Sequence, residues 1–149
     1  MATLLQRLRN TKRWGSWIAY AEEKNITLSC EGQGVLKGDA VLLQRALCNL
    51  FANALQYTPD GGCIKVNLST LPRRKRIRID ICDNGAGIEA KHLPYLFNRF
   101  YQVDAARSKA DTLGLGLSIV KSIVCLHQGQ VNIQSTPKAG TTVSLVFPF

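Results

Sequence analysis

Hydrophobic positions recur along this chain with two different periods, and the clearest helical stretch is Asp39–Tyr57. Its apolar residues are spaced by three and four positions: Leu43, Leu47, Leu50 and Ala54. That spacing places them on one face of a helix, with Asn49 and Asn53 one turn apart on a neighbouring stripe. The pattern therefore predicts an amphipathic helix that carries two carboxamides beside its buried face.

The other elements are predicted from the same periods and from the Gly and Pro residues between them. Helices are expected over about Leu4–Glu23, Glu89–Phe97 and Gly114–His127, two short strands within Ile26–Lys37, and longer strands near Cys63–Thr70, Lys75–Cys82, Gln130–Ser135 and Thr141–Phe147. Hairpin-linked strands and segregated helices indicate an α/β (α+β) two-layer sandwich. We expect a helical or linker segment over residues 1–24 and one domain over residues 25–149.

A carboxylate lies at the end of one predicted strand and is followed by two glycines, in the run Asp83-Asn84-Gly85-Ala86-Gly87-Ile88. Such a turn can close under a flat polar ligand that the acid hydrogen-bonds, and a nucleobase fits that description. The same residues are also ordinary turn chemistry. The motif therefore predicts a binding loop only together with its neighbours.

The two asparagines of the Asp39–Tyr57 helix need a reason, because asparagine is a mediocre helix former. Their carboxamide oxygens could hold a hard cation such as Mg²⁺, which prefers oxygen ligands and shares them with substrate phosphates. A solvated helix face with local hydrogen bonds is the alternative. Arg45, Gln56 and Tyr57 are expected close to the same stripe.

Closely spaced glycines, Gly114 and Gly116, open the apolar helical run that ends near His127. Backbone N–H groups exposed at a helix N-terminus attract an anion, and the helix dipole favours it there. The motif is neither the dinucleotide fingerprint nor the phosphate loop. It predicts a phosphate-binding helix start, with close helix packing as the alternative.

Aromatic residues precede that motif in the run Leu96-Phe97-Asn98-Arg99-Phe100-Tyr101-Gln102, and the segment Asp104–Thr112 that follows has no hydrophobic period. The combination indicates a hinge and a mobile cover over a pocket. An aromatic cluster that caps the core is the alternative.

In this order, the four segments resemble the ATP-binding catalytic domain of sensor histidine kinases, in the superfamily shared with gyrase, heat-shock chaperone and mismatch-repair ATPases. The resemblance extends from about Asp39 to the end of the chain. It implies a Bergerat-type ATP-binding fold, in which a mixed, largely antiparallel sheet packs on about three helices and a lid covers the ATP. It also implies ATP and Mg²⁺ as the bound ligands.

The resemblance carries roles to matching positions of this chain. Asn49 and Asn53 look like the asparagine box, whose second asparagine binds magnesium, and Asp83 looks like the aspartate that accepts from the adenine amino group. The residues implied to bind nucleotide are Asn49, Asn53, Tyr57, Asp83, Gly85, Gly87, Ile88, Phe97, Phe100, Gly114, Leu115, Gly116, Leu117 and Thr142, with Asn53 as the metal ligand. Phe97 and Phe100 match the phenylalanine box, and Gly140 to Val143 match the closing strand motif.

Three positions depart from the family pattern. Gln56 stands where the family often has a basic residue, so one phosphate contact is weaker or comes from elsewhere. Thr112 and Leu113 stand where the second glycine box usually begins Gly-Ser/Thr, which implies a stiffer lid and a lower nucleotide affinity. Asn49 stands where hydrolysing relatives have a glutamate base, and an amide cannot take a proton from water. Phosphoryl transfer is therefore favoured over ATP hydrolysis.

Neither histidine has the setting of a phosphoryl acceptor, which in the family has an acid directly after it. His92 precedes Leu93, and His127 precedes Gln128. We therefore expect a catalytic domain whose acceptor histidine lies on a separate dimerisation domain, with a response regulator as the next partner. The parent is expected to be a homodimer anchored on the cytoplasmic side of a bacterial inner membrane, and the chain itself a soluble monomer. The run from His92 to Ser108 resembles heavy-metal sensors of the copper and silver type.

Composition and charge change this picture little. A length of 149 residues with 46% hydrophobic residues suits a globular domain, and no apolar run approaches the roughly 20 residues that span a bilayer. Five scattered cysteines indicate free, mostly buried thiols rather than a metal site. The net charge of +9 suggests a nucleic-acid-binding module as a rival, but no recognition helix or stacking ladder supports it. An acidic partner domain or anionic lipid fits that charge better.

Overall fold

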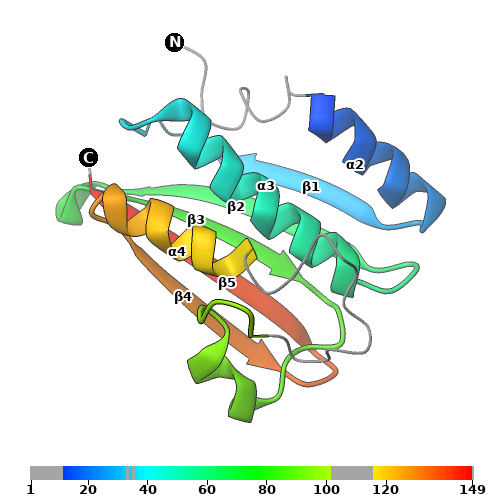
Figure 1. Cartoon of the computed structure of the whole chain (residues 1–149). Coiled ribbons are helices and arrows are strands. Elements are labelled where there is room, and N and C mark those ends of the chain that lie inside the picture. The colour runs from blue at the N-terminus through cyan, green and yellow to red at the C-terminus, as the bar shows by residue number, and fades with distance from the viewer. Residues whose placement is uncertain (1–11, 33, 35, 102–115, 149) are drawn as a thin grey trace.

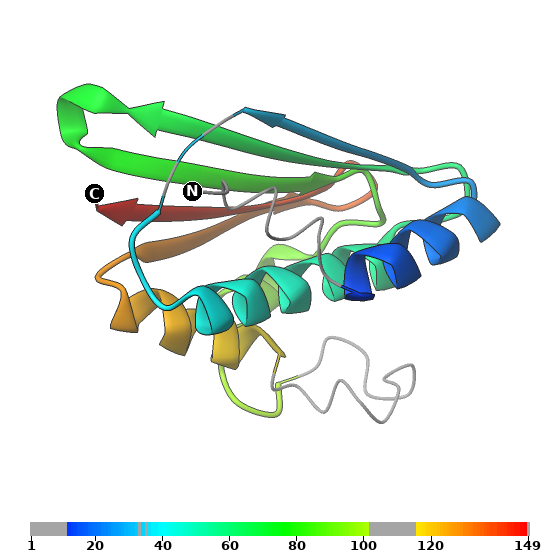
Figure 2. The ribbon, with the colours of Figure 1, turned by 90° about the horizontal axis from the view of Figure 1, so that it is seen from above.

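A five-stranded sheet with helices on one face makes up the part of this chain that the computed structural model describes, residues 12–32, 34, 36–101 and 116–148 (Figure 1). The helices are α2 (Lys12–Glu23), α3 (Ala40–Tyr57) and α4 (Gly116–Leu126), with short 3₁₀ turns η1 (Pro72–Arg74) and η2 (Ala90–Tyr95). The strands are β1 (Thr27–Gly32), β2 (Cys63–Leu71), β3 (Arg76–Asp83), β4 (Gln130–Thr136) and β5 (Gly140–Pro148). The helices lie side by side under one face of the sheet, so the fold has two layers, as predicted (Figure 2).

The strand order across the sheet is β1-β2-β3-β5-β4. Only β1 pairs in parallel, with β2, and the other three pairings are antiparallel. The parallel strand follows from the chain path, because α3 lies between β1 and β2 and crosses over the sheet face. The prediction of a mixed, largely antiparallel sheet is confirmed.

The core lies between the inner face of the sheet and helices α3 and α4. In β3, Ile77, Ile79 and Ile81 alternate with polar residues and are each at most 3% exposed. They face a helix whose apolar stripe includes the fully buried Phe51. The buried side chains of the alternating strand and those of the amphipathic helix thus pack against each other in one core.

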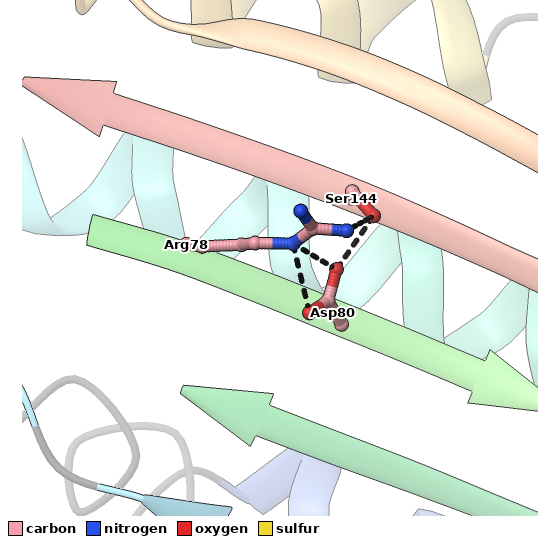
Figure 3. A network of polar contacts seen from close by, with 3 residues as sticks. All are labelled: Arg78, Asp80 and Ser144. Carbon is pink, nitrogen blue, oxygen red and sulfur yellow. Dashed lines mark hydrogen bonds and ion pairs between the residues drawn. The ribbon is translucent and has the colours of Figure 1, made fainter. Parts of the chain in front are cut away.

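The outer face of the sheet is polar. On adjacent strands β3 and β5, Arg78 donates from Nε to both carboxylate oxygens of Asp80, at 2.9 and 3.0 Å, and from Nη2 to Ser144 Oγ at 3.3 Å (Figure 3). Ser144 Oγ in turn donates to Asp80. This network lies on the side of the sheet away from the helices, where it satisfies an acid whose side chain is only 18% exposed.

His127 joins the end of α4 to the start of α3. Its Nδ1 bonds the carbonyl oxygen of Ile123 at 2.7 Å, and its Nε2 accepts the backbone N–H of Asp39 at 3.0 Å. The ring passes close over Gly38, where an added Cβ would lie 2.4 Å from His127 Cδ2. Asp39 itself caps α3 by accepting from the N–H groups of Val41 and Leu42. His127 is therefore a structural link between two helices.

Two predicted elements differ from the structure. Two strands were expected within Ile26–Lys37, but its described residues form one, β1, which ends at Gly32. Gly32 has φ +95° and lies against the backbone of β2, so the chain turns out of the sheet there. The helix expected over Glu89–Phe97 is the 3₁₀ turn η2, which contains Pro94, a residue that lacks the N–H an α-helix needs.

The cysteines also correct one expectation. All five are free, but only Cys48 is buried, while Cys63 and Cys125 are exposed. Cys63 is exposed because it follows the outward-facing period of β2, and Cys125 is exposed on α4.

The predicted helix over Leu4–Glu23 is described only from Lys12 onward, so residues 4–11 lie outside the described part of the chain. Among the helices described, none is long and apolar enough to span a membrane.

Candidate nucleotide-binding site

One stripe of α3 carries Asn49, Asn53 and Tyr57 at successive turns. Asn49 and Asn53 are half-buried, and Tyr57 is 53% exposed at the end of the helix. The neighbouring stripe, which includes Leu50 and Ala54, is buried in the core. The helix therefore fixes both carboxamides at the edge of the core, as its periodicity predicted.

Asp83 ends β3 and begins the loop that faces this stripe. Its Oδ1 accepts the backbone N–H of Gly85 at 2.9 Å, and the backbone of Thr141 also hydrogen-bonds to it. Burial raises the pKa of the Asp83 carboxyl, and these two hydrogen bonds lower it in part. A carboxylate can accept about four hydrogen bonds, so capacity remains for a ligand donor such as an amino group.

The two glycines of the loop allow close backbone contacts on both sides. A Cβ on Gly85 would lie 2.5 Å from the carbonyl oxygen of Tyr57, at the end of α3. Gly87 has φ +73°, and a Cβ there would lie 2.1 Å from the carbonyl oxygen of Thr136. The loop is thus clamped between α3 and the β4–β5 hairpin, which leaves no room for side chains.

Hydrogen bonds from outside the predicted motifs hold the same loop. Ile88 N–H donates to Ser135 Oγ at 2.7 Å, and Ser135 Oγ lies 2.8 Å from Thr141 Oγ1. Asn84 Oδ1 accepts the N–H of Cys63 at 2.7 Å, which ties the loop to the start of β2. Sequence analysis missed Ser135 and Cys63 because their roles come from strand pairing, and nothing in their local sequence marks them.

Strand register decides which threonine of β5 faces the site. Thr141 pairs with Asp83, whereas Thr142 pairs with Cys82. Successive side chains of a strand point to opposite faces, so Thr141 shares the face of Asp83 and Thr142 lies on the outer face. The structure therefore brings Thr141, and not the predicted Thr142, together with Asp83.

Helix α4 begins at Gly116, beside the asparagine stripe. Asn49 Nδ2 donates to the carbonyl oxygen of Gly116 at 3.4 Å, so the two helices meet at this point. Gly116 and Leu117 are half-buried in the first turn. Gly114, Leu115 and the predicted cover Asp104–Thr112 lie outside the described residues.

The two phenylalanines of the aromatic motif have different surroundings. Phe97 is half-buried, and Lys121 of α4 places its Nζ 5.8 Å from the ring centroid. Phe100 is 70% exposed and has φ +66°. Phe97 thus packs toward α4, while Phe100 lies on the surface.

A cavity of about 420 Å³ adjoins the loop on the side of Tyr57 and Gly85. Its lining residues come from four connections at one end of the sheet: Lys24, Gln56, Tyr57, Thr58, Pro59, Asn84, Gly85, Ala86 and Lys138. Gln56 and Tyr57 therefore face open space next to the Asp83 loop. This is the end of the molecule at which the predicted site residues gather.

Comparison with known proteins agrees with this geometry. The family model described as "Histidine kinase-, DNA gyrase B-, and HSP90-like ATPase" matches residues 38–149, which include every site residue predicted from the sequence. The chain belongs to this ATPase family. Its Asp83 loop, α3 stripe and α4 start are therefore parts of a histidine-kinase-type ATP-binding domain.

Relatives within the ATPase family are sensor kinases. Sensor histidine kinase CusS of Escherichia coli O157:H7 is 41% identical over 132 residues, which are 87% of this chain and 27% of CusS. The solved structure of the mycobacterial sensor histidine kinase MprB has a TM-score of 0.80 at 25% identity and covers 99% of this chain and 96% of that one. Full-length ShkA in complex with AMPPNP has a TM-score of 0.79 at 25% identity, covering 96% of this chain and 29% of ShkA. The chain thus spans about a quarter of the length of CusS.

The oxygen donors of this ATPase domain suit a magnesium ion that is shared with phosphates. Among the described residues, no group of three or more His, Cys, Asp or Glu side chains could hold a metal. The asparagine stripe offers neutral carboxamide oxygens instead, and Mg²⁺ is typically held by few protein ligands together with phosphates and water. The residues present fit Mg²⁺ bound with a nucleotide, and they do not form a cage for the ion alone.

Proposed function

We propose that this chain binds Mg²⁺-ATP between α3, the Asp83 loop and the start of α4, and donates the γ-phosphoryl group to a histidine of a separate domain. The observation that carries the proposal is Asp83, a half-buried acceptor at the end of a strand, held by Gly85 and Thr141 on the side of the sheet that carries the asparagine stripe. In this proposal Asp83 accepts from the adenine amino group. The glycines let the backbone close under the base.

The phosphates would extend from Asp83 toward Asn53, Asn49 and the first turn of α4. Asn53 would hold Mg²⁺ through its side-chain oxygen, and the ion would supply charge neutralisation at the phosphates. The N-terminus of α4 adds a favourable dipole for the same charges. The contribution of the protein is positioning, because phosphoryl transfer leaves it little covalent chemistry.

Hydrolysis of ATP is the alternative, and Asn49 argues against it. Its amide nitrogen donates to Gly116 O at 3.4 Å, so this side chain is turned toward the start of α4. A carboxamide cannot act as the general base that activates water. We therefore propose a kinase domain rather than a rapid ATPase.

The settings of the histidines support an acceptor outside this chain. Both nitrogens of His127 are engaged by backbone groups of Asp39 and Ile123, and His92 Nδ1 lies in hydrogen-bonding contact with the hydroxyl of Tyr101. We propose that the acceptor lies on a dimerisation domain of a homodimeric, membrane-anchored parent, with a response regulator as the next partner. The similarity to CusS supports the heavy-metal sensor subfamily as part of this proposal.

Incubation with γ-labelled ATP tests the proposal. The chain alone should bind ATP, stay unlabelled and release phosphate very slowly, because it lacks both an acceptor and a general base. Addition of the histidine-bearing domain of its parent should give labelling on that domain, although inefficiently without a tether. Stable labelling of the chain itself would contradict the separate acceptor, and rapid phosphate release would favour the hydrolysing relatives.

A further inference from the structure

The hairpin between β2 and β3 ends in four consecutive cationic residues, Arg73, Arg74, Lys75 and Arg76, here named the basic tip. Arg73 and Arg74 belong to the 3₁₀ turn η1, and Lys75 closes it in the left-handed conformation, with φ +51°. The first three side chains are exposed, and Arg76 is half-buried. The turn thus presents its charges on a convex surface.

The charges of the basic tip have no acidic partner in the described part of the chain. The ion pairs found there join Lys65 to Glu31, Arg78 to Asp80 and Lys91 to Glu89. Arg78, the next outward-facing cation of β3, is therefore neutralised by its own neighbour, whereas the tip is not. Four adjacent like charges repel one another, so an external anion would be favoured there.

The basic tip lies at the end of the sheet opposite the nucleotide loop. Arg76 is the first residue of β3 and Asp83 the last, which separates them by about 23 Å at roughly 3.3 Å per residue. The hairpin reaches beyond the end of β1 at this side of the molecule (Figure 2). A surface in contact with the tip would therefore leave the nucleotide site free.

We propose that the basic tip binds the anionic phospholipid headgroups of a membrane surface. Each basic residue near such a surface increases binding by about fivefold, and the attraction needs no fixed pairing geometry. A protruding turn can approach a flat, uniformly charged layer with all of its cations. Peripheral binding of this kind acts through surface charge and needs no membrane-spanning segment.

The surroundings of the tip favour lipid over a protein or nucleic-acid partner. Specific protein interfaces have an apolar core, but among the described residues the exposed large apolar side chains lie on other elements: Ile18, Val41, Tyr57, Tyr95, Phe100 and Leu126. The tip also has no aromatic residue on which bases could stack. The basic tip therefore suits a flat surface with evenly spread negative charge better than it suits a protein or a nucleic acid.

Flotation with lipid vesicles tests this proposal on the full chain. It should bind vesicles that contain phosphatidylglycerol and should not bind vesicles of phosphatidylcholine alone. Binding should be lost at about 1 M salt, where the Debye length falls to about 3 Å. Binding to neutral vesicles, or binding that resists salt, would overturn the electrostatic proposal.

A matched pair of variants separates the tip from the overall charge. Arg73→Gln/Arg74→Gln/Lys75→Gln should weaken vesicle binding about a hundredfold, at about fivefold per residue. Lys12→Gln/Lys37→Gln/Arg99→Gln removes the same charge from exposed residues elsewhere that take part in none of these ion pairs, and it should change binding by less than about tenfold. Unchanged ATP affinity in the tip variant would show that it is folded.

Equal losses in the two variants would overturn the proposal in favour of net charge. A competition arm uses a double-stranded DNA oligonucleotide against the same vesicles. If DNA binds the chain more tightly than the vesicles do, and the tip variant loses that binding, the partner is nucleic acid and the membrane proposal is wrong. Vesicle binding that persists in the tip variant would also contradict it.

Discussion

Partial burial of the Asp83 carboxylate is unfavourable in the free chain, and a ligand that hydrogen-bonds to it can offset this desolvation. Burial raises the pKa of its carboxyl, so the folded state holds this proton more tightly than the unfolded chain does. Asp83 therefore lowers the free energy of unfolding as the pH rises from below its unfolded pKa to above its folded pKa. The ionised carboxylate is incompletely solvated, and this favours an added hydrogen-bond donor.

Asp83→Asn separates binding from stability. An amide can still accept from Gly85 and Thr141, so the loop should keep its shape. The introduced amide would face the adenine amino group with a donor, and ATP affinity should fall by about 1–3 kcal/mol with weaker discrimination against GTP. Calorimetric titration with both nucleotides measures this. Unchanged ATP affinity would sink the assignment.

The same variant gives a pH test. Its thermal unfolding midpoint should rise relative to that of the parent as the pH rises above the ordinary pKa of aspartic acid, because the parent then carries a partly buried charge that the variant lacks. The difference should vanish below about pH 3.9, the ordinary pKa of aspartic acid, since the parent is then protonated in both states. A variant that is markedly less stable at pH 7 would mean that the charge itself holds the loop.

Asn53→Ala should weaken nucleotide binding mainly when magnesium is present. The physical reason is that its carboxamide oxygen would bind the ion rather than the base. Asn49→Ala is the matched change one turn earlier, and it should reduce affinity less because Asn49 is turned toward Gly116. Titrations over a magnesium series compare the two. Binding by both variants as tightly as by the parent would favour a solvated helix face.

The positions of residues around Asp83 were predictable where they depend on local sequence and were not predictable where they depend on strand register. The position of Asp83 follows from the alternation of β3 and the glycines after it. The closing strand motif spans both Thr141 and Thr142, and a shift of one residue reverses the face of a strand. Ser135 could not be found, since its contact with Ile88 joins segments 47 positions apart.

At the scale of elements, α4 is fixed to α3 at both of its ends. Asn49 contacts Gly116 where α4 begins, and His127 contacts Asp39 and Gly38 where α4 ends. The helix that carries the asparagines is thereby held in one position relative to the helix that we propose faces the phosphates. Such support is what a preorganised binding site requires.

His127→Phe should loosen this link. The ring would still fill the space beside Gly38 and Phe147, but the hydrogen bonds with Asp39 N–H and Ile123 O would be lost. We expect the free energy of unfolding to fall by about 1–2 kcal/mol, measured by urea denaturation. His92→Phe is the control, because it changes a histidine whose hydrogen-bond partner, Tyr101, belongs to a loop. An equal loss in both would indicate a general effect of removing imidazole.

Element existence was more predictable than element type. The long amphipathic α3 and the alternating strands β2, β3 and β5 were correctly placed because each repeats its period several times. A second strand was wrongly predicted after β1. The stretch between Gly32 and Gly38 is too short for its hydrophobic pattern to distinguish a strand from a loop. The six residues of η2, which include Pro94, are too few to show whether their pattern is that of an α-helix or of a 3₁₀ turn.

At the scale of the whole molecule, the two ends of the sheet have separate chemistry. Connections at one end form the Asp83 loop and the cavity beside it, whereas the hairpin at the other end carries the basic tip. The polar outer face between them holds the Arg78–Asp80–Ser144 network (Figure 3). This network crosses from β3 to β5 and so joins the two central strands on the side that the helices do not cover.

The edge strand β1 is held less firmly than the central strands of the sheet. β1 pairs only with β2, in the one parallel pairing, and none of its residues is fully buried. Its amide hydrogens should therefore exchange with solvent through local unfolding, at a lower opening free energy than those of Ile79 and Ile81 in β3. Native-state hydrogen exchange at low denaturant measures this. Equal opening energies in β1 and β3 would mean that the sheet opens only as one unit.

Because of this edge strand, we expect the chain to unfold in more than one step. α2 directly precedes β1, but it packs Trp14 and Trp17 on the buried Phe51 of α3, so detachment of the strand leaves this helix held on the core. The antiparallel β2-β3-β5-β4 sheet, in which β3 ends at Asp83, keeps its pairings when β1 detaches. We therefore expect β1 to detach and re-form as a local unit under conditions in which the Asp83 loop stays folded.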